Sequence, residues 1–406
     1  MRTNVTKRPC PVGNTRNITV AKRNLADSDL NFKTQVTRTV VNVLNVYYSL
    51  VGNYEDLRAK QNALEAAQKF YDESKKRLEL GALAQLDVTT AQNQVATSQQ
   101  ALINSESTRR QQELQLKNLI SRTGIGDPLI AAAEIIPVDP LVIPSTDEIP
   151  PIQELVKLSL ANRSDLIAER HNLESSEISG LGTLSGLKPS AQVFTNHSNA
   201  GLAGNPRIVL NRNGTSYTSD PYLVGGVGNA LGQVLRRNYP TDTIGTFGQA
   251  TIHNRQAQAD YAIDQLSLRQ QQLITARDLN QAQVDIANSV VALRQARARY
   301  EAAVQSRTLQ EQLYAAEEKK FNLGASTPYN VVVQQRDLAT AQAAELGARV
   351  TYQSARISLD QTTGTTLDVN HVSLTEAESG RISQPSALPA TLPESSPAAA
   401  QSPARN

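Results

Sequence analysis

The sequence predicts a mainly α fold made of long antiparallel coiled-coil helical hairpins, with a few β-strands between them. Three observations support this prediction. Only 4% of the 406 residues are aromatic and Trp is absent, a composition typical of long helices that pack through small side chains. Residues of one seam recur every seven positions, and two similar stretches, each with a glycine, interrupt otherwise helical sequence.

The seven-residue repeat runs through both halves of the chain. In the first half it comprises Leu57, Leu64, Tyr71 and Leu78 before the glycine of the first such stretch, and Val88, Val95 and Leu102 after it. In the second half it comprises Val331, Leu338, Glu345, Tyr352 and Leu359. Small residues such as Ala91 and Ala341 follow three positions later, so two helices can approach each other closely. A heptad kept over this length predicts left-handed supercoiling.

The two glycine stretches predict hairpin tips. LELGALAQLDV (78–88) and FNLGASTPYNV (321–331) align at an offset of 243 positions, which indicates an internal repeat. Gly81 and Gly324 are placed to end a helix in the left-handed conformation, which glycine adopts without a steric penalty. Loops of about six or seven residues then favour antiparallel hairpins over continuous rods. The candidate caps of the returning helices are Asp87, Thr327 and Asn330, with Pro328 preventing helix continuation.

Six segments are expected along the chain. Residues 1–25 form an irregular N-terminus in which RNITVAKR (16–23) is a candidate remnant strand, and residues 376–406 form a disordered tail rich in Pro, Ala and Ser. Between them lie the first helical hairpin (26–124), a Pro-rich linker with an equatorial helix (125–187), β-strands with a long loop (188–254) and the second helical hairpin (255–375). The expected equatorial helix covers 152–180, and the expected strands cover 189–198 and 241–252.

The composition argues against several classes of function. A formal net charge of +2, with acidic and basic residues interspersed, offers no basic stripe for nucleic acid. The four histidines are far apart and no nucleophile, P-loop or dinucleotide motif occurs, so we expect no catalytic, cofactor-binding or metal-binding residues and no enzyme activity. No apolar run is long enough for a transmembrane helix, and the N-terminus carries no apolar signal segment. Arginines expected on solvated helix faces or in interhelical pairs are Arg77, Arg109, Arg110, Arg294, Arg297 and Arg299.

Motifs around the strands and tips follow a recognisable order. Besides the two tips, they are ANRSDLIAERHNLESSEISG (161–180), LKPS (187–190), NYPTDTIGTFGQATIHNRQAQADY (238–261) and LDQTTGTTL (359–367). Together they give helix, strand, long loop, strand, very long helix, glycine tip and returning helix in a chain that repeats itself. Over roughly residues 17–375 this order resembles the TolC family of outer-membrane efflux proteins.

The resemblance implies a homotrimeric channel without cofactors. Strands of three subunits would form one transmembrane β-barrel in the bacterial outer membrane, and the helices would continue it as a periplasmic α-barrel tunnel. The implied partners are outer-membrane lipid, a periplasmic adaptor and an inner-membrane transporter of a multidrug efflux or type I secretion system that exports small molecules or proteins. The implied adaptor-contact residues are Leu80, Gly81, Ala82, Leu83, Leu323, Gly324, Ala325 and Ser326. The candidate aperture residues are Asp87 and Asn330.

The chain departs from the family pattern in two places. Family members often carry a carboxylate six residues after the second tip glycine, where this chain has Asn330, so a carboxylate-based gate is not expected. The signal peptide, first long helix and first strand of the family do not precede the first hairpin. We therefore expect a fragment or an N-terminally truncated protein in preference to a degenerate family member.

Two other classes of protein remain as alternatives. A structural coiled-coil protein would explain the heptads but not the strands expected at 189–198 and 241–252. A periplasmic adaptor also projects a helical hairpin, but it typically has one hairpin inserted into a lipoyl-type β domain, whereas this chain has two hairpins.

Overall fold

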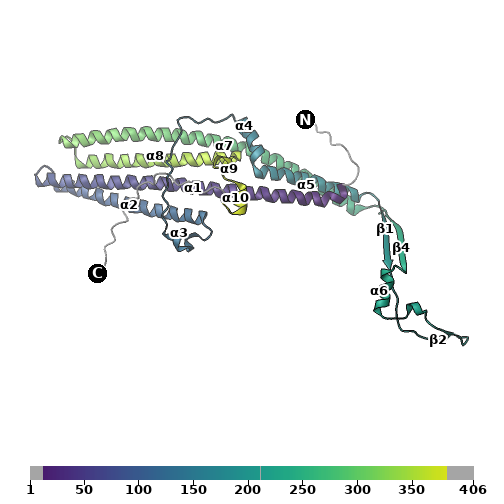
Figure 1. Ribbon diagram of the computed structural model, residues 1–406. Helices are drawn as coiled ribbons and strands as arrows, with labels where there is room; N and C mark the ends of the chain where they lie inside the picture. The colour runs from purple at the N-terminus through teal and green to yellow at the C-terminus, as the bar shows by residue number, and fades with distance from the viewer. Residues whose placement is uncertain (1–11, 211, 382–406) are drawn as a thin grey trace, which may run out of the picture. The chain divides into compact units, whose positions relative to one another are not determined.

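The computed structural model describes residues 12–210 and 212–381, and this part of the chain is mainly α-helical (Figure 1). The predicted fold class is therefore confirmed. The described residues form two compact units, and the chain passes from one unit to the other after Val20, after Glu174 and after Gln270. No helix among the described residues is both long enough and apolar enough to cross a membrane.

Two helical hairpins with matching bounds dominate the structure. The first consists of α1 (Val12–Glu79) and α2 (Gln85–Ile120), and the second of α7 (Arg255–Asn322) and α8 (Pro328–Thr363). The long helix has 68 residues and the returning helix 36 residues in both hairpins, and every bound of the second lies 243 positions after its counterpart in the first. The offset read from the two tips thus holds over both hairpins, and the predicted internal repeat is confirmed.

The apolar core of the larger unit lies where α7, α8 and α4 (Ile152–Asn162) meet. Tyr352 and Leu359, two of the predicted heptad positions on α8, are buried there. Residues packed with them are Leu155 from α4 and Ile286, Val290, Leu293 and Ala296 from α7. The heptad pattern therefore marks the buried side of α8, as expected for helices that pack along one seam.

A segment without regular structure, residues 133–151, follows the short helix α3 (Pro128–Ala132), leads into α4 and contacts both hairpins. On the first hairpin, the hydroxyl of Tyr54 donates to the carbonyl oxygen of Ile135 at 2.9 Å, and that of Tyr47 donates to Asp139 Oδ2 at 2.9 Å. Prolines in this segment cannot donate backbone hydrogen bonds, so the segment forms no regular secondary structure. Side chains of the first hairpin therefore donate hydrogen bonds to its acceptor groups.

The same linker then contacts the second hairpin through Asp147. Arg297 Nε donates to Asp147 Oδ2 at 2.6 Å, and its Nη2 donates to the carbonyl oxygen of Pro144 at 2.8 Å. Tyr352 donates its hydroxyl hydrogen to the other Asp147 oxygen, and Gln353 donates to the carbonyl oxygen of Val142 at 3.1 Å. The hydrogen bond from Arg297 keeps the pKa of the Asp147 carboxyl below its usual value. Charge-assisted hydrogen bonds therefore connect the linker to α7 and α8.

The equatorial helix is interrupted, contrary to the single helix expected over 152–180. The chain forms α4 (Ile152–Asn162) and α5 (Ser164–Gly186), separated by Arg163 in an extended conformation. The end of α8 explains the break, because Ser159 Oγ donates to the carbonyl oxygen of Thr362 at 3.0 Å and Gly364 lies directly against the backbone of Asn162 and Arg163. Gly364 itself has φ 76°, a left-handed conformation that glycine adopts readily.

The N-terminal expectation was wrong within the described residues. RNITVAKR (16–23), the candidate remnant strand, belongs to α1, which already starts at Val12, and residues 1–11 lie outside the described part. Contacts with α5 hold this part of α1: Arg23 pairs with Glu174 at 2.5 Å, and Asp27 lies 2.7 Å from His171 Nδ1. No proline or glycine interrupts residues 14–51, so a helix packed on α5 satisfies the backbone better than an isolated strand would.

The smaller unit contains the two predicted long strands. β1 (Ser190–Asn199) pairs antiparallel with β4 (Pro240–Gln249), in a register that runs from Ser190 opposite Gln249 to Asn199 opposite Pro240. The strands expected at 189–198 and 241–252 are confirmed. Phe194 lies opposite Gly245 and its ring covers the space where a Cβ would stand, which fixes the register at this pair.

The connection between β1 and β4 is more ordered than the long loop that was expected. It contains the two-residue pair β2 (Val209–Leu210) and β3 (Ser216–Tyr217), and the helix α6 (Val227–Leu235). At the other end of the chain, α9 (Thr366–Val369) and α10 (Leu374–Ser379) follow α8. Residues 376–379, expected in a disordered tail, are thus helical, and residues 382–406 lie outside the described part.

A close approach of α1 and α8 at Gly52 leads to a stability prediction. A Cβ at Gly52 would stand 2.7 Å from Cγ2 of Val350, a β-branched side chain with little rotamer freedom. We expect Gly52→Ala to cost about 1–3 kcal/mol through overpacking, whereas Gly347→Ala should stabilise by about 0.5–1 kcal/mol because no atom lies near its Cβ and Ala favours a helix. Thermal unfolding followed by circular dichroism measures both, and equal effects of the two variants would contradict this packing.

Candidate functional site: the two hairpin tips

The first tip ends α1 with two backbone hydrogen bonds around Gly81. Gly81 has φ 73°, and its N–H donates to the carbonyl oxygen of Leu78 at 2.8 Å. The N–H of Ala82 donates to the carbonyl oxygen of Arg77, also at 2.8 Å. These two bonds are those of a Schellman motif, which satisfies carbonyl groups left unpaired at the end of a helix.

The second tip repeats this geometry. Gly324 has φ 74°, its N–H donates to the carbonyl oxygen of Phe321 at 3.0 Å, and the N–H of Ala325 donates to that of Lys320 at 2.8 Å. A Cβ at Gly81 or Gly324 would meet no atom within 4 Å. Glycine is therefore required at both tips by the backbone conformation and not by lack of space.

The returning helices start in similar ways with different side chains. Ala84 is the N-cap of α2 and Asp87 lies three residues later, where its Oδ2 accepts a hydrogen bond from the N–H of Ala84 at 3.3 Å. Asp87 therefore stabilises the start of α2 from within its first turn, as a side chain that accepts from the N-cap residue. The prediction that Asp87 caps α2 was right about this helix start, but the N-cap position itself belongs to Ala84. In α8, Thr327 is the N-cap without a side-chain cap bond, and Pro328 occupies the first turn.

Asn330 occupies the position in α8 that Asp87 occupies in α2. Its amide nitrogen donates to Ser326 Oγ at 3.4 Å. Ser326 in turn donates to Glu317 on α7, and Lys320 pairs with the same carboxylate at 3.0 Å. These bonds, led by that from Ser326, lower the pKa of the Glu317 carboxyl. The second tip therefore carries a carboxylate on α7 and not at Asn330.

Arg77 connects the two tips. Its Nη2 donates to Asn322 Oδ1 at 2.8 Å and its Nη1 donates to the carbonyl oxygen of Phe321 at 3.2 Å. The guanidinium also lies over the Phe321 ring, 4.3 Å from the centroid, and the Phe70 ring lies 5.3 Å from that of Phe321. A cation at the C-terminal end of α7 is further favoured by the helix dipole. The interhelical role expected for Arg77 is therefore the contact that holds the ends of α1 and α7 together.

The outer surface of the tips is apolar and uncovered. Leu80 and Leu323 stand at equivalent positions of the repeat, with 83% and 84% of their surface exposed. Gly81, Ala82, Gly324 and Ala325 are exposed beside them, while Leu83 and Ser326 are partly buried. Each tip therefore exposes a leucine beside small residues, and exposed apolar surface of this kind is typical of interaction sites.

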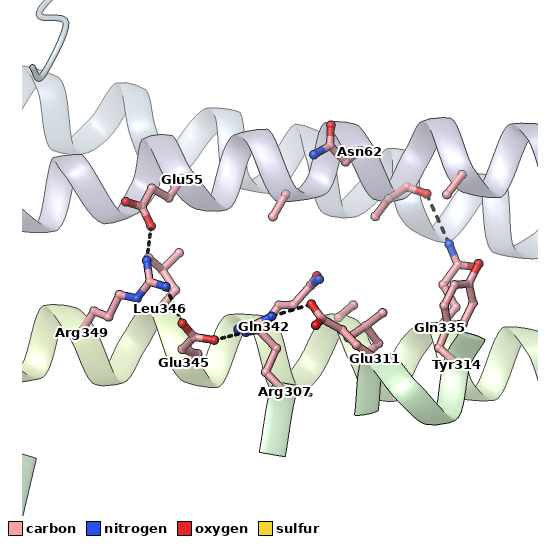
Figure 2. A pocket seen from close by; sticks show the side chains of 15 residues that line it. Glu55, Asn62, Arg307, Glu311, Tyr314, Gln335, Gln342, Glu345, Leu346 and Arg349 are labelled. Carbon is pink, nitrogen blue, oxygen red and sulfur yellow. Dashed lines mark hydrogen bonds and ion pairs between the residues drawn. The ribbon is translucent and has the colours of Figure 1, made fainter. Parts of the chain in front are cut away.

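A groove of ≈ 560 Å³ lies between α1 and the second hairpin (Figure 2). Its polar end is a network centred on Glu345, whose side chain is only 4% exposed and bonds with Arg307 and Arg349. Arg307 also pairs with Glu311 at 2.6 Å, and Arg349 reaches Glu55 on α1 at 3.3 Å. The network links the two hairpins. Glu345 stands at one of the predicted heptad positions, but the sequence pattern does not identify its partners.

Of the other arginines considered from the sequence, Arg294 and Arg299 are exposed on α7, whereas Arg109, Arg110 and Arg297 form ion pairs. Arg109 is buried on α2, where it donates to Tyr54, Glu113 and Glu134 at 2.9, 3.2 and 3.1 Å. Arg297 holds the linker as described, and Arg110 pairs with Glu106 at 2.9 Å on an exposed surface. Among the described residues, no group of three or more His, Cys, Asp or Glu side chains could hold a metal ion.

Solved structures of outer-membrane channels share this fold of paired helical hairpins with an antiparallel strand pair between the repeats. VceC from Vibrio cholerae is 17% identical, with a TM-score of 0.66 over 87% of this chain and 76% of that chain. CmeC from Campylobacter jejuni is 14% identical, with a TM-score of 0.63 over 87% and 68%. MtrE from Neisseria gonorrhoeae is 15% identical, with a TM-score of 0.66 over 86% and 71%.

A family model described as outer membrane efflux protein matches residues 12–122. No curated protein matches the chain as a sequence. Residues 12–122 are thus similar to outer membrane efflux proteins and the chain has the fold of these channels, so the predicted resemblance to the TolC family is confirmed. These findings support an outer-membrane channel and do not favour a coiled-coil protein or an adaptor.

The contacts of Arg77 predict its effect on the tips. Arg77→Ala removes two hydrogen bonds and the stacking on Phe321, so we expect the local free energy of opening at the tips to fall by about 1–3 kcal/mol. Amide hydrogen exchange at residues 78–86 and 321–330 measures this opening. Lys75→Ala, at an exposed position one half-turn earlier on α1, is the matched control and should leave exchange unchanged. Equal protection in both variants would contradict the role of Arg77.

Proposed function

We propose that this chain is the outer-membrane channel subunit of a tripartite efflux or secretion system. It acts as a homotrimer in the bacterial outer membrane with a periplasmic extension, and it passes small molecules or proteins through its interior. The observation that carries the proposal is the strand pair β1–β4 placed between two equal helical hairpins, because neither a coiled coil nor an adaptor requires that arrangement.

The strand pair supports a role for sister subunits. β1 and β4 form a sheet of two strands, so each has one edge whose backbone groups have no ladder partner within the described sheet. Unpaired backbone groups are costly where water is excluded, and open edges invite pairing with strands of other chains. Pairing with strands of two further copies would satisfy these edges and enclose a central passage.

The tips support the expected adaptor contact. Leu80 and Leu323 expose apolar surface at the ends of rigid helices, and the left-handed glycines shape the backbone between them. The contact surface that we propose consists of Leu80, Gly81, Ala82, Leu83, Leu323, Gly324, Ala325 and Ser326. Asp87 and Asn330 stand at equivalent places behind it, where they would line the periplasmic aperture. An inner-membrane transporter completes the proposed system.

Conductance tests the channel proposal directly. The full chain, purified in detergent and added to a planar bilayer, should form trimers and conduct ions in steps of uniform size, because a water-filled passage admits ions without a binding step. Chemical crosslinking before insertion measures the trimer, and current recordings measure the conductance. Crosslinked trimers that never conduct, or conduction by a monomer, would contradict the proposal.

The left-handed glycines predict a graded loss of adaptor contact. Gly81→Val and Gly324→Val place a β-branched residue at φ 73° and 74°, so we expect the tip backbone to change and crosslinking to a periplasmic adaptor to fall about tenfold, with trimers retained. Gly81→Asn should lose less, because Asn tolerates this conformation. The matched control is Gly126→Val, at an exposed glycine without positive φ. Unchanged crosslinking in both valine variants would refute the tip assignment.

A further inference from the structure

The helix α6, in the connection between β1 and β4, has its polar side turned inward. Gln233 is only 1% exposed, and its side chain accepts a hydrogen bond from the N–H of Leu202 at 2.9 Å and donates to the carbonyl oxygen of Tyr222 at 3.1 Å. Asn229, one turn earlier, donates to the carbonyl oxygens of Tyr222 and Val224 at 2.9 and 3.2 Å. Both amides thus bind the connection to the helix.

Further contacts hold the same side of α6 in place. Gly201 lies so close to α6 that a Cβ there would collide with the carbonyl oxygen of Ala230. The segments before and after η2 (Pro221–Leu223) also bond to each other, since the N–H of Gly204 donates to the carbonyl oxygen of Leu223 at 3.0 Å and that of Gly225 donates to Gly204 at 3.1 Å. The inner side of α6 is therefore packed against the rest of the connection.

The outer side of α6 is apolar and exposed. Val227, Leu231 and Leu235 follow one another at intervals of four residues, so they share one face of the helix. Their exposed fractions are 78%, 56% and 82%. A helix in water normally turns its apolar face inward and its polar face outward. This reversed arrangement indicates that α6 faces an apolar medium in the working protein.

The charge of the connection indicates which medium this is. Residues 200–239 contain four arginines, one aspartate and no lysine or glutamate, a net charge of +3 on forty residues in a chain whose total is +2. Arg236 and Arg237 directly follow α6 and are exposed. An apolar helical face next to clustered arginines complements a lipid surface with anionic headgroups.

We propose that α6 lies in the interface of a bilayer, with Val227, Leu231 and Leu235 among the acyl chains and Arg236 and Arg237 at anionic headgroups. This inference rests on one part of the proposed function, namely that the chain resides in a bilayer. It assigns a lipid contact to α6, which lies outside both the strand pair and the hairpins. A surface of sister subunits is the competing occupant of this face.

A single tryptophan tests the proposal, because the chain has none of its own. The full chain carrying Leu231→Trp is reconstituted in vesicles of phosphatidylcholine, or of equal parts phosphatidylcholine and phosphatidylglycerol. We expect the tryptophan to emit at a shorter wavelength than a tryptophan in water and to be quenched by lipids with brominated acyl chains. Both effects should be larger in the vesicles that contain phosphatidylglycerol. Thr218→Trp, at an exposed position of the same connection, is the matched control and should be quenched by aqueous acrylamide in both vesicles.

The arginines are tested on the same reporter. Adding Arg236→Gln and Arg237→Asn should lower the ratio of membrane-inserted to water-exposed α6 in phosphatidylglycerol vesicles by about tenfold. Asn replaces Arg237 because this position has φ 53°, which Asn tolerates. Quenching of the Leu231→Trp fluorescence by acrylamide in both kinds of vesicle would overturn the proposal. Quenching by neither acrylamide nor brominated lipid would also overturn it, since another copy of the chain would then cover the tryptophan. Failure of the channel proposal appears separately, as loss of conductance without a change in the reporter signal.

Discussion

The structure depends on two sharp reversals of the chain, each made by a glycine in the left-handed conformation. Gly81 and Gly324 follow the ends of helices of 68 residues and reverse the chain before returning helices of 36 residues, so each turn decides which helix faces can meet along a hairpin. No neighbouring atom forces glycine at either site. Glycine is needed because other residues adopt this left-handed backbone conformation only at a cost in free energy. This conformation reverses the chain and so produces the hairpins.

Polar contacts supply much of the cohesion between the hairpins, because small side chains in the seams leave modest apolar area to bury. Arg77 joins the tips, the Glu345 network joins α1 to α7 and α8, and Asp147 with Arg297 joins the linker to the second hairpin. The Glu345 and Asp147 side chains are nearly buried, so the cost of their desolvation offsets much of the attraction to their arginines. They hold the two hairpins in one arrangement, as a tunnel wall would require.

The repeat is exact in its helix bounds but not in its chemistry. Asp87 in the first hairpin corresponds to Asn330 in the second, and Arg77 corresponds to Lys320, which pairs with Glu317 instead of crossing to another helix. Two equal scaffolds thus present different groups at the tips. In a trimer, such alternation would give six tips of two kinds around the aperture, and a partner could distinguish them.

The sequence by itself determined the parts that depend on local conformation and on periodicity: the two tips, the repeat, the buried side of α8 and the strands β1 and β4. It missed features that arise from contacts between distant segments. The break at Arg163 exists because the end of α8 packs there. Residues 16–23 form part of the helix α1 and not a strand, and Arg23 pairs with Glu174 on α5. The same holds for α6, whose inward amides bind backbone groups that only the folded connection brings near. Tertiary structure decided these points because burial and hydrogen bonding between remote residues outweigh the weak preferences of short segments.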